Sequence, residues 1–203
     1  MANKFFFQPV RMESQFVDTK LQTVICQKSG ADVAVTDGAL FVLDTKFAVD
    51  PVYKNAFTNA GKAADAPVDV NCRIAKEYAA ATEAIGVIDL AVVGTAEGQG
   101  NTYRLGYKTI GLTEEAGVPV RFRVLELNDT FVTGRENCTE DLTVGQYAVP
   151  STTTVGSWKA AADSSAAGLC CLVVDEYVVS QGVDGNVTSG NGVKAYVLCV
   201  VKK

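Results

Sequence analysis

The residues best suited to chemistry in this sequence are carboxylates, lysines and cysteines, because histidine is absent from all 203 residues. Histidine is the commonest general base and a common metal ligand, so its absence excludes Ser-His-Asp and Cys-His catalysis. The most suggestive group is Asp175-Glu176 beside Tyr177, which would suit a ligand-binding or hydrolytic β protein. Adjacent strand residues point to opposite faces, however, so the two carboxylates cannot share one site and are expected to face solvent.

The six cysteines, at positions 26, 72, 138, 170, 171 and 199, form no recognisable metal or disulfide framework. No Cys-x-x-Cys spacing occurs, which argues against a zinc site. The N-terminal MANKFFFQPVRM has no secretory apolar region, so we expect an unexported chain with reduced thiols. We interpret the cysteines as small apolar core residues.

Two glycine-bearing segments resemble ligand loops but lack the residues that would bind a ligand. Gly98-Gln99-Gly100 is followed neither by a Lys-Ser/Thr pair nor by a helical pattern, so it predicts a hairpin connection. The segment beginning at Asp184 starts like a calcium loop, but Ser189 replaces the required glycine and Ala195 the bidentate glutamate. We therefore predict no enzyme activity, no catalytic, metal-binding or cofactor-binding residues, no cofactor and no small-molecule substrate.

Charge and hydropathy restrict the partners further. The formal net charge is −5, and the sequence shows no basic patch beyond Lys202-Lys203. A surface of this sign repels phosphate backbones, so nucleic-acid binding is not expected. The longest apolar runs, such as Leu169 to Val174, are far shorter than the roughly 20 residues of a membrane-spanning helix, and no membrane partner is predicted.

The elements that must position these residues are mostly strands. Apolar residues make up 48% of the chain and charged residues 20%, which is typical of a folded protein. Gly, Thr, Ser and Val are abundant, which favours strands and turns. We predict a mainly β fold: two small antiparallel β-barrel or β-sandwich-like domains with an extended N-terminal arm. The boundaries are 1–20 for the arm, 21–115 for a β-rich domain and 116–203 for a C-terminal antiparallel β domain.

In the first half, strands starting at Leu21 are separated by turns at Ser29-Gly30 and Asp37-Gly38, which predicts a meander. The segment 73–85 has apolar residues at helical spacing and many alanines, so it is the best helix candidate, although the same alanines would also suit a loop. Asp89 follows within an apolar strand, where we interpret it as an edge or solvent-facing residue.

In the second half, Val120 to Leu125 alternates as a strand, a turn at Asn128-Asp129 reverses the chain, and 144–149 is again extended. Trp158, the single tryptophan, is expected to cap the core of this domain. The segments 169–179 and 193–201 are nearly continuous apolar strands, as expected when both faces are covered.

The N-terminal 20 residues leave two interpretations open. Phe5, Phe6 and Phe7, followed by Pro9, could form a first edge strand packed on the core. Alternatively they form an arm that docks its aromatic rings into a neighbouring subunit, because three exposed aromatics in a row would otherwise be a liability. In the second case, deleting residues 1–12 should abolish binding to that neighbour and leave the fold intact.

Several segments of the sequence resemble small β-rich virion proteins of tailed bacteriophages, particularly head decoration or auxiliary capsid proteins. These segments are KSGADVAVTDGALFVL, YRLGYKTIGL, VPVRFRVLELNDTFVTGRENC and VGQYAVPSTTTVGSW. The resemblance covers most of residues 28–201 and matches no invariant site. It implies a structural protein that binds the outside of the capsid and stabilises it, located in the virion (capsid) and made in the host cytoplasm. The implied partners are the major capsid protein and neighbouring copies of the same chain.

Two alternatives accompany this interpretation. One is a tail-tube, head-fibre or baseplate component of the same kind of particle, which self-assembly into rings or tubes would distinguish. The other, of a different class, is the ligand-binding or hydrolytic β protein considered above, which a pH-dependent activity lost on Asp175→Asn would support.

Overall fold

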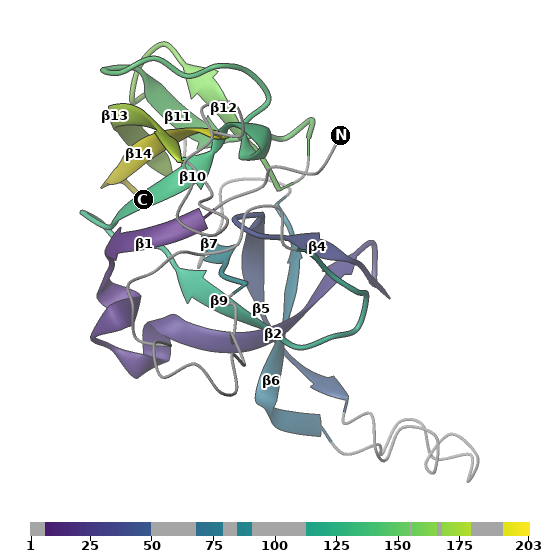
Figure 1. Cartoon of the computed structure of the whole chain (residues 1–203). Helices are drawn as coiled ribbons and strands as arrows, with labels where there is room; N and C mark the ends of the chain where they lie inside the picture. Colours follow the sequence, from purple (N-terminus) through teal and green to yellow (C-terminus); the bar gives the residue numbers. More distant parts are fainter. Residues whose placement is uncertain are drawn as a thin grey trace, which may run out of the picture.

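The computed structural model describes residues 7–49, 68–78, 85–90, 113–154, 156–165, 168–179 and 193–203. In these residues the chain is mainly β, as the sequence predicts. Figure 1 shows two principal units: a closed five-stranded barrel in the lower half and a six-stranded sheet above it. The described residues contain no helix that is long and apolar enough to cross a membrane.

The barrel strands are β2 (Leu21–Lys28), β6 (Val68–Glu77), β5 (Leu40–Val49), β7 (Ile85–Ile88) and β9 (Val120–Val124), in that order around the ring. β9 pairs with both β7 and β2, which closes the barrel. The β2–β6 pair is parallel and the other pairs are antiparallel. The short β3 (Ala31–Asp32) extends β2 through a hairpin whose turn residues, Ser29 and Gly30, both have positive φ, as primed hairpin turns require.

The six-stranded sheet has the order β1 (Phe7–Arg11), β10 (Thr130–Gly134), β14 (Val193–Lys202), β13 (Cys170–Val179), β11 (Tyr147–Pro150) and β12 (Trp158–Ala161). All its pairs are antiparallel. A third, two-stranded sheet joins β4 (Val35–Thr36) to β8 (Thr113–Glu114). Three short 3-10 turns complete the described elements: η1 (Glu13–Gln15), η2 (Asp18–Lys20) and η4 (Arg135–Asn137).

Successive side chains of β5 and β7 belong to two different apolar clusters, and in this way the two strands connect the barrel with the upper sheet. Phe41 and Ile88 belong to the apolar cluster of the barrel, whereas Leu40 and Val87 belong to a second cluster shared with the six-stranded sheet. Gly86 precedes Val87 and lies opposite Phe41, and a Cβ there would be only 2.4 Å from both the ring of Phe122 and the carbonyl oxygen of Arg123. The barrel therefore offers one face of β5 and β7 to its own interior and the other to the upper sheet.

The shared cluster is centred on aromatic side chains. Phe7 and Phe131 have ring centroids 5.6 Å apart, and Phe131 lies 5.8 Å from Trp158. All three side chains are fully buried. The prediction that Trp158 packs into the core of the C-terminal part of the chain is confirmed, and that core extends onto the outer surface of the barrel.

Several expectations about local structure are corrected. Residues 73–77 are not helical but form the second half of β6, which lies between β2 and β5 and is held by ladders on both sides; residues 79–84 lie outside the described residues. The strands on either side of the Asn128-Asp129 turn do not pair, because β9 belongs to the barrel and β10 to the upper sheet. The change of sheet therefore follows Val124, whereas the predicted division was at residues 115 and 116.

The meander prediction is correct for its first and last strands, but its middle segment forms two short strands, β3 and β4, and the pairing is only partly as predicted. The β2–β3 hairpin forms at Ser29-Gly30, but β4 pairs with β8 and β5 pairs with β6 and β7. The segment 92–105 and the loop 181–192, for which hairpin connections were predicted, lie outside the described residues.

Asp89 is buried and not solvent-facing, contrary to the sequence-based interpretation. Its Oδ2 lies 2.6 Å from Nε of Arg123 and 3.6 Å from Nε of Arg121. Arg123 is also buried and donates from Nη1 to the Oγ of Ser14 at 3.2 Å. The sequence pattern around Asp89 indicates exposure because the arginine that pairs with it, Arg123, lies 34 residues further along the chain. No local pattern reveals such a partner.

Candidate protein-binding surface

The structure places the predicted arm residues in two ways. Phe7 and Pro9 lie in β1, which pairs with β10 at one edge of the upper sheet. Phe7 is fully buried, and its N–H donates to Oδ2 of Asp37 at 2.8 Å. Pro9 is half-buried at the sheet edge, where a residue without an N–H is tolerated. Phe5 and Phe6 lie outside the described residues. Phe7 is thus a core residue in this fold and offers no surface to a partner.

The aromatic residue that the N-terminal segment does present to solvent is Phe16. Its side chain is 79% exposed, the highest value among the large apolar residues described. It directly follows η1, and its own N–H donates to the carbonyl of Glu13 at 2.9 Å. The sequence carries only a faint signal for it, an isolated Phe16-Val17 pair within a polar run, which the denser Phe5-Phe6-Phe7 cluster overshadows.

The backbone beneath Phe16 is anchored by the buried carboxylate of Asp129. Its Oδ1 accepts the N–H of Glu13 at 2.7 Å, and its Oδ2 accepts the N–H of Glu126 at 2.8 Å. Burial raises the pKa of Asp129 above its usual range, and these two N–H donors oppose the rise. One side chain therefore joins η1 to the connection between β9 and β10.

Glu126 adds an ionic connection at the same place. Its carboxylate pairs with Lys20 at the end of η2 and, at 2.6 Å, with Lys203 at the C-terminus. Burial alone would raise the pKa of Glu126, but the hydrogen bonds from the two lysines outweigh burial, so the pKa lies below its usual range. The N-terminal segment, the β9–β10 connection and the end of the chain are thereby held together.

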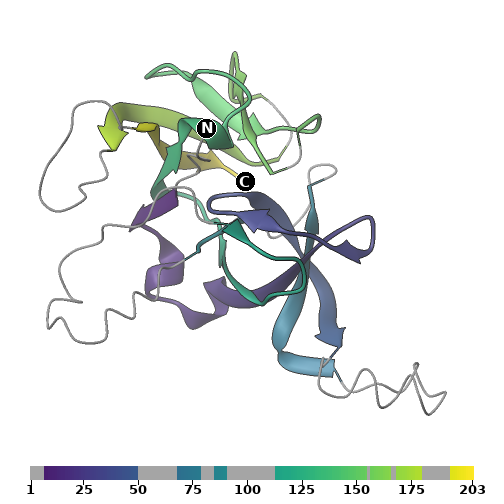
Figure 2. The ribbon, with the colours of Figure 1, turned by 45° about the vertical axis from the view of Figure 1, so that its right-hand side comes forward.

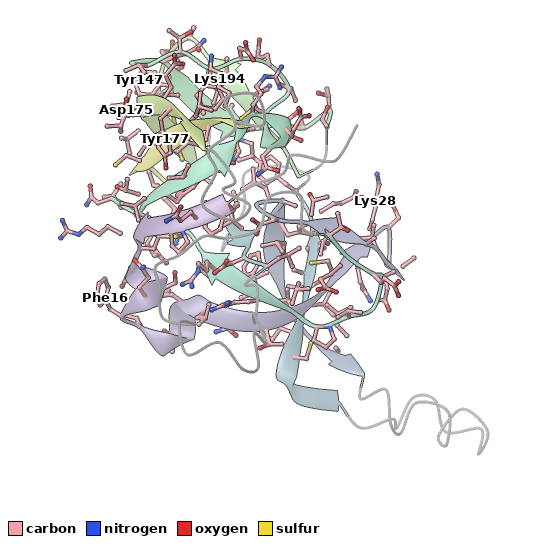
Figure 3. All side chains as sticks on the ribbon, in the orientation of Figure 1. Phe16, Lys28, Tyr147, Asp175, Tyr177 and Lys194 are labelled. Atoms are coloured by element: carbon pink, nitrogen blue, oxygen red, sulfur yellow. The ribbon has the colours of Figure 1, made fainter. Side chains whose placement is uncertain are left out.

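Five exposed apolar residues lie on the segments that meet at this anchor, and we call them the junction surface: Val10, Phe16, Val17, Leu127 and Val201. Their elements meet through hydrogen bonds, since Asn128 donates to the carbonyl of Val200 at 2.8 Å and Glu13 donates to Asp129. Figure 3 shows Phe16 pointing outward on the left-hand side of the molecule. An exposed aromatic residue on anchored backbone, with exposed aliphatic residues on the adjoining segments, is the composition of a protein contact site.

The acidic residues that suggested hydrolytic chemistry are not gathered into a site. Asp175 and Glu176 are both exposed, as predicted, and they face Val197 and Tyr196 respectively on β14. Glu176 pairs with Lys194 at 3.3 Å. Burial, followed by the charge of Asp175, raises the pKa of Tyr177. The two carboxylates project to opposite faces of the hairpin, so they cannot act on one substrate as an acid and base pair.

Other places in the described residues offer little chemistry. A hollow of about 180 Å³ is lined mainly by apolar groups of β4 and β5, including Val35, Ala39 and Phe41, with Lys28 as its charged member; Lys28 is labelled at the right of Figure 3. Within the described ranges, no three His, Cys, Asp or Glu side chains come together as metal ligands would. All six cysteines are free thiols, and burial raises the pKa of both Cys26 and Cys138 to about 12.

Comparisons with known proteins identify no relative, so any assignment of function depends on the sequence and the structure. No protein-family model matches the chain, and no curated protein and no solved structure is significantly similar to it.

Proposed function

We propose that this chain is a structural protein of a bacteriophage virion that binds the outside of the capsid and stabilises it. The observation that carries the proposal is the junction surface: an almost fully exposed phenylalanine held on anchored backbone, with no role in the core. Binding a lattice requires shape and apolar contact and no reactive group, which suits a chain whose exposed acids lie apart. The resemblance of its strand and turn phrases to decoration proteins supports the same assignment.

Anchoring is what makes the junction surface suitable as a contact. Phe16 belongs to a segment that is tied by Asp129 to the β9–β10 connection and by Lys20 to Glu126. A side chain on fixed backbone loses less conformational entropy on binding than one on a free tail. The proposed contact therefore differs from the predicted flexible arm, although it uses the same N-terminal 20 residues.

The proposal is tested by adding the purified chain to empty capsids of the phage that encodes it and measuring co-sedimentation. Phe16→Ser should weaken binding at least about tenfold, since central aromatic anchors contribute most of the affinity of an interface. Val118→Ser is the matched control, because Val118 is also exposed but precedes β9 at the end away from Glu126. Its binding should equal that of the wild type.

Three outcomes would contradict the proposal or its details. Equal loss for Phe16→Ser and Val118→Ser would exclude the junction surface as the contact. Saturable binding that neither substitution changes would keep the capsid as partner and move the contact elsewhere. Rings or tubes formed by the chain alone, without binding to capsids, would assign it to the tail.

A further inference from the structure

Among the described residues, one edge of β13 has no paired strand over half of its length. Toward β11 its register ends at Leu172, and the last backbone contacts on that side are those of Val173 with Gly145 and Gln146. Beyond that point, no described strand pairs with this side of β13. Figure 2 shows the far end of the β13–β14 hairpin at the left of the upper sheet, away from β11 and β12.

The free edge carries apolar side chains in addition to unpaired backbone. Val174, Tyr177 and Val178 are 48%, 41% and 65% exposed, and Asp175 and Glu176 between them are also exposed. Tyr177 and Asp175 are labelled on the outer side of the hairpin in Figure 3. Unpaired strand edges of this composition are templates for a further strand.

The backbone geometry fixes which residues a further strand would bond. Val173 directs its N–H and carbonyl toward β11. A bulge between Val173 and Asp175 adds one residue to the strand, so the next residues directed to the free side are Glu176 and Val178. In the single chain the N–H of Glu176 donates to the Oδ1 of Asp175 at 2.8 Å, a bond that pairing with a further strand would replace.

We propose that the occupant of this edge is the β13 edge of a second copy, paired antiparallel about a two-fold axis that passes through Tyr177. In this register Glu176 of each copy lies opposite Val178 of the other, and each of these two pairs exchanges two backbone hydrogen bonds. A pairing centred on Glu176 would instead bring two glutamates directly opposite each other and would require hydrogen bonds from the bulged Val174.

Charge and packing agree with the same register. The two Tyr177 rings meet across a pair without hydrogen bonds, where cross-strand side chains approach most closely and aromatic pairs are favourable. The two Glu176 residues are then offset by two positions along the strands, which separates their Cα atoms by about 8 Å. Each Glu176 also keeps its own Lys194 at 3.3 Å. Such an edge contact is smaller than a standard interface, so the dimer should be weak, with a dissociation constant on the order of 100 µM.

Cysteine cross-linking tests the register directly. Tyr177→Cys should form a covalent dimer under mild oxidation, because the Cα atoms of an antiparallel pair lie within the range that a disulfide spans, whereas Glu176→Cys on the same edge should not, at about 8 Å. The wild type, whose Cys199 is half-buried, measures the background of cross-linking by the native cysteines. Cross-linking of both variants to the same extent, or of neither, would overturn the proposal.

Sedimentation velocity tests the pairing without a covalent trap. The wild type should shift from monomer toward dimer as its concentration rises through about 100 µM. Val178→Pro removes one of the N–H groups directed to the partner at a position where an edge strand tolerates proline, and it should remain monomeric. Phe16→Ser should associate like the wild type, which separates this contact from the junction surface. Association of Val178→Pro equal to the wild type, with Trp158 fluorescence unchanged, would refute the pairing.

Discussion

Replacing Phe7 by alanine distinguishes a core strand from a free arm. The Phe7 side chain is completely buried and lies 5.6 Å, ring to ring, from Phe131. Replacing a phenylalanine that is buried this fully by alanine lowers the free energy of unfolding by about 3–5 kcal/mol, because apolar transfer energy is lost and a cavity is left behind. For a chain of this length that cost corresponds to a melting temperature lower by roughly 6–20 °C. Phe7→Leu, which keeps most of the volume, should cost less than about 1.5 kcal/mol.

Phe16→Ala is the matched comparison from the same segment. With 79% of the side chain exposed, about 40 Å² of it is covered, and at about 25 cal/mol per Å² the loss should not exceed about 1 kcal/mol. Both variants are measured by urea unfolding, followed through the fluorescence of Trp158, the single tryptophan. This reporter is apt because Trp158 lies in the same buried cluster as Phe7, one ring beyond Phe131.

The result that would refute this reasoning is a Phe7→Ala protein as stable as the wild type. In that case β1 would not belong to the core, and the earlier interpretation of residues 1–12 as a dispensable docking arm would regain its support. Deleting residues 1–12 removes an edge strand together with Phe7 and Met12, both fully buried. The deletion should then destabilise the fold, so it is unsuitable as a binding test.

Three further substitutions probe the barrel and the junction. Asp89→Ala should cost about 3–5 kcal/mol in urea unfolding, because it leaves the buried guanidinium of Arg123 without its close partner; a loss below 1 kcal/mol would contradict the pairing. Gly86→Ala should cost about 1–3 kcal/mol by forcing a methyl group against Phe122, and an unchanged melting temperature would contradict the close approach. Because the pKa of Glu126 is lowered in the folded state, its carboxylate should stabilise the fold above its unfolded pKa, and this stability should be lost as the pH falls through the folded pKa. Glu126→Gln should therefore lose stability at pH 7 but change little near pH 3. Equal losses at both pH values would refute the ionic role.

Much of the strand content was predictable because it is local. The alternation from Val120 to Val124, the Ser29-Gly30 turn and the burial of Trp158 all follow from short-range pattern and residue type. The helix predicted at 73–85 is wrong for residues 73–77. Ile74 and Ala75 of β6 fit either period, and pairing with β2 on one side and β5 on the other makes this segment a strand. Tertiary context overrides propensity most easily where side chains are small.

The candidate contact site was not predictable, for a different reason. Consecutive strands usually pair, so β9 and β10 would be expected to form a hairpin, yet Asp129 and Glu126 use the connection between them to hold η1, η2 and the C-terminus. The separations in sequence are 116 residues for Glu13 to Asp129 and 106 for Lys20 to Glu126. Exposure of Phe16 results from these long-range contacts, and no window of neighbouring residues contains them.

The two proposed contacts lie on different strands of one sheet, which affects how they would work together. The junction surface borders β1 at one edge, whereas the free part of β13 is separated from β1 by β10 and β14. A copy bound through Phe16 would therefore keep its β13 edge open to a neighbour. Pairing with a dissociation constant on the order of 100 µM leaves dilute chains monomeric, but sites held side by side on a shell experience effective concentrations in the millimolar range. Edge pairing would then form on the lattice at chain concentrations too low for dimers in solution, so each chain could link to a neighbour there.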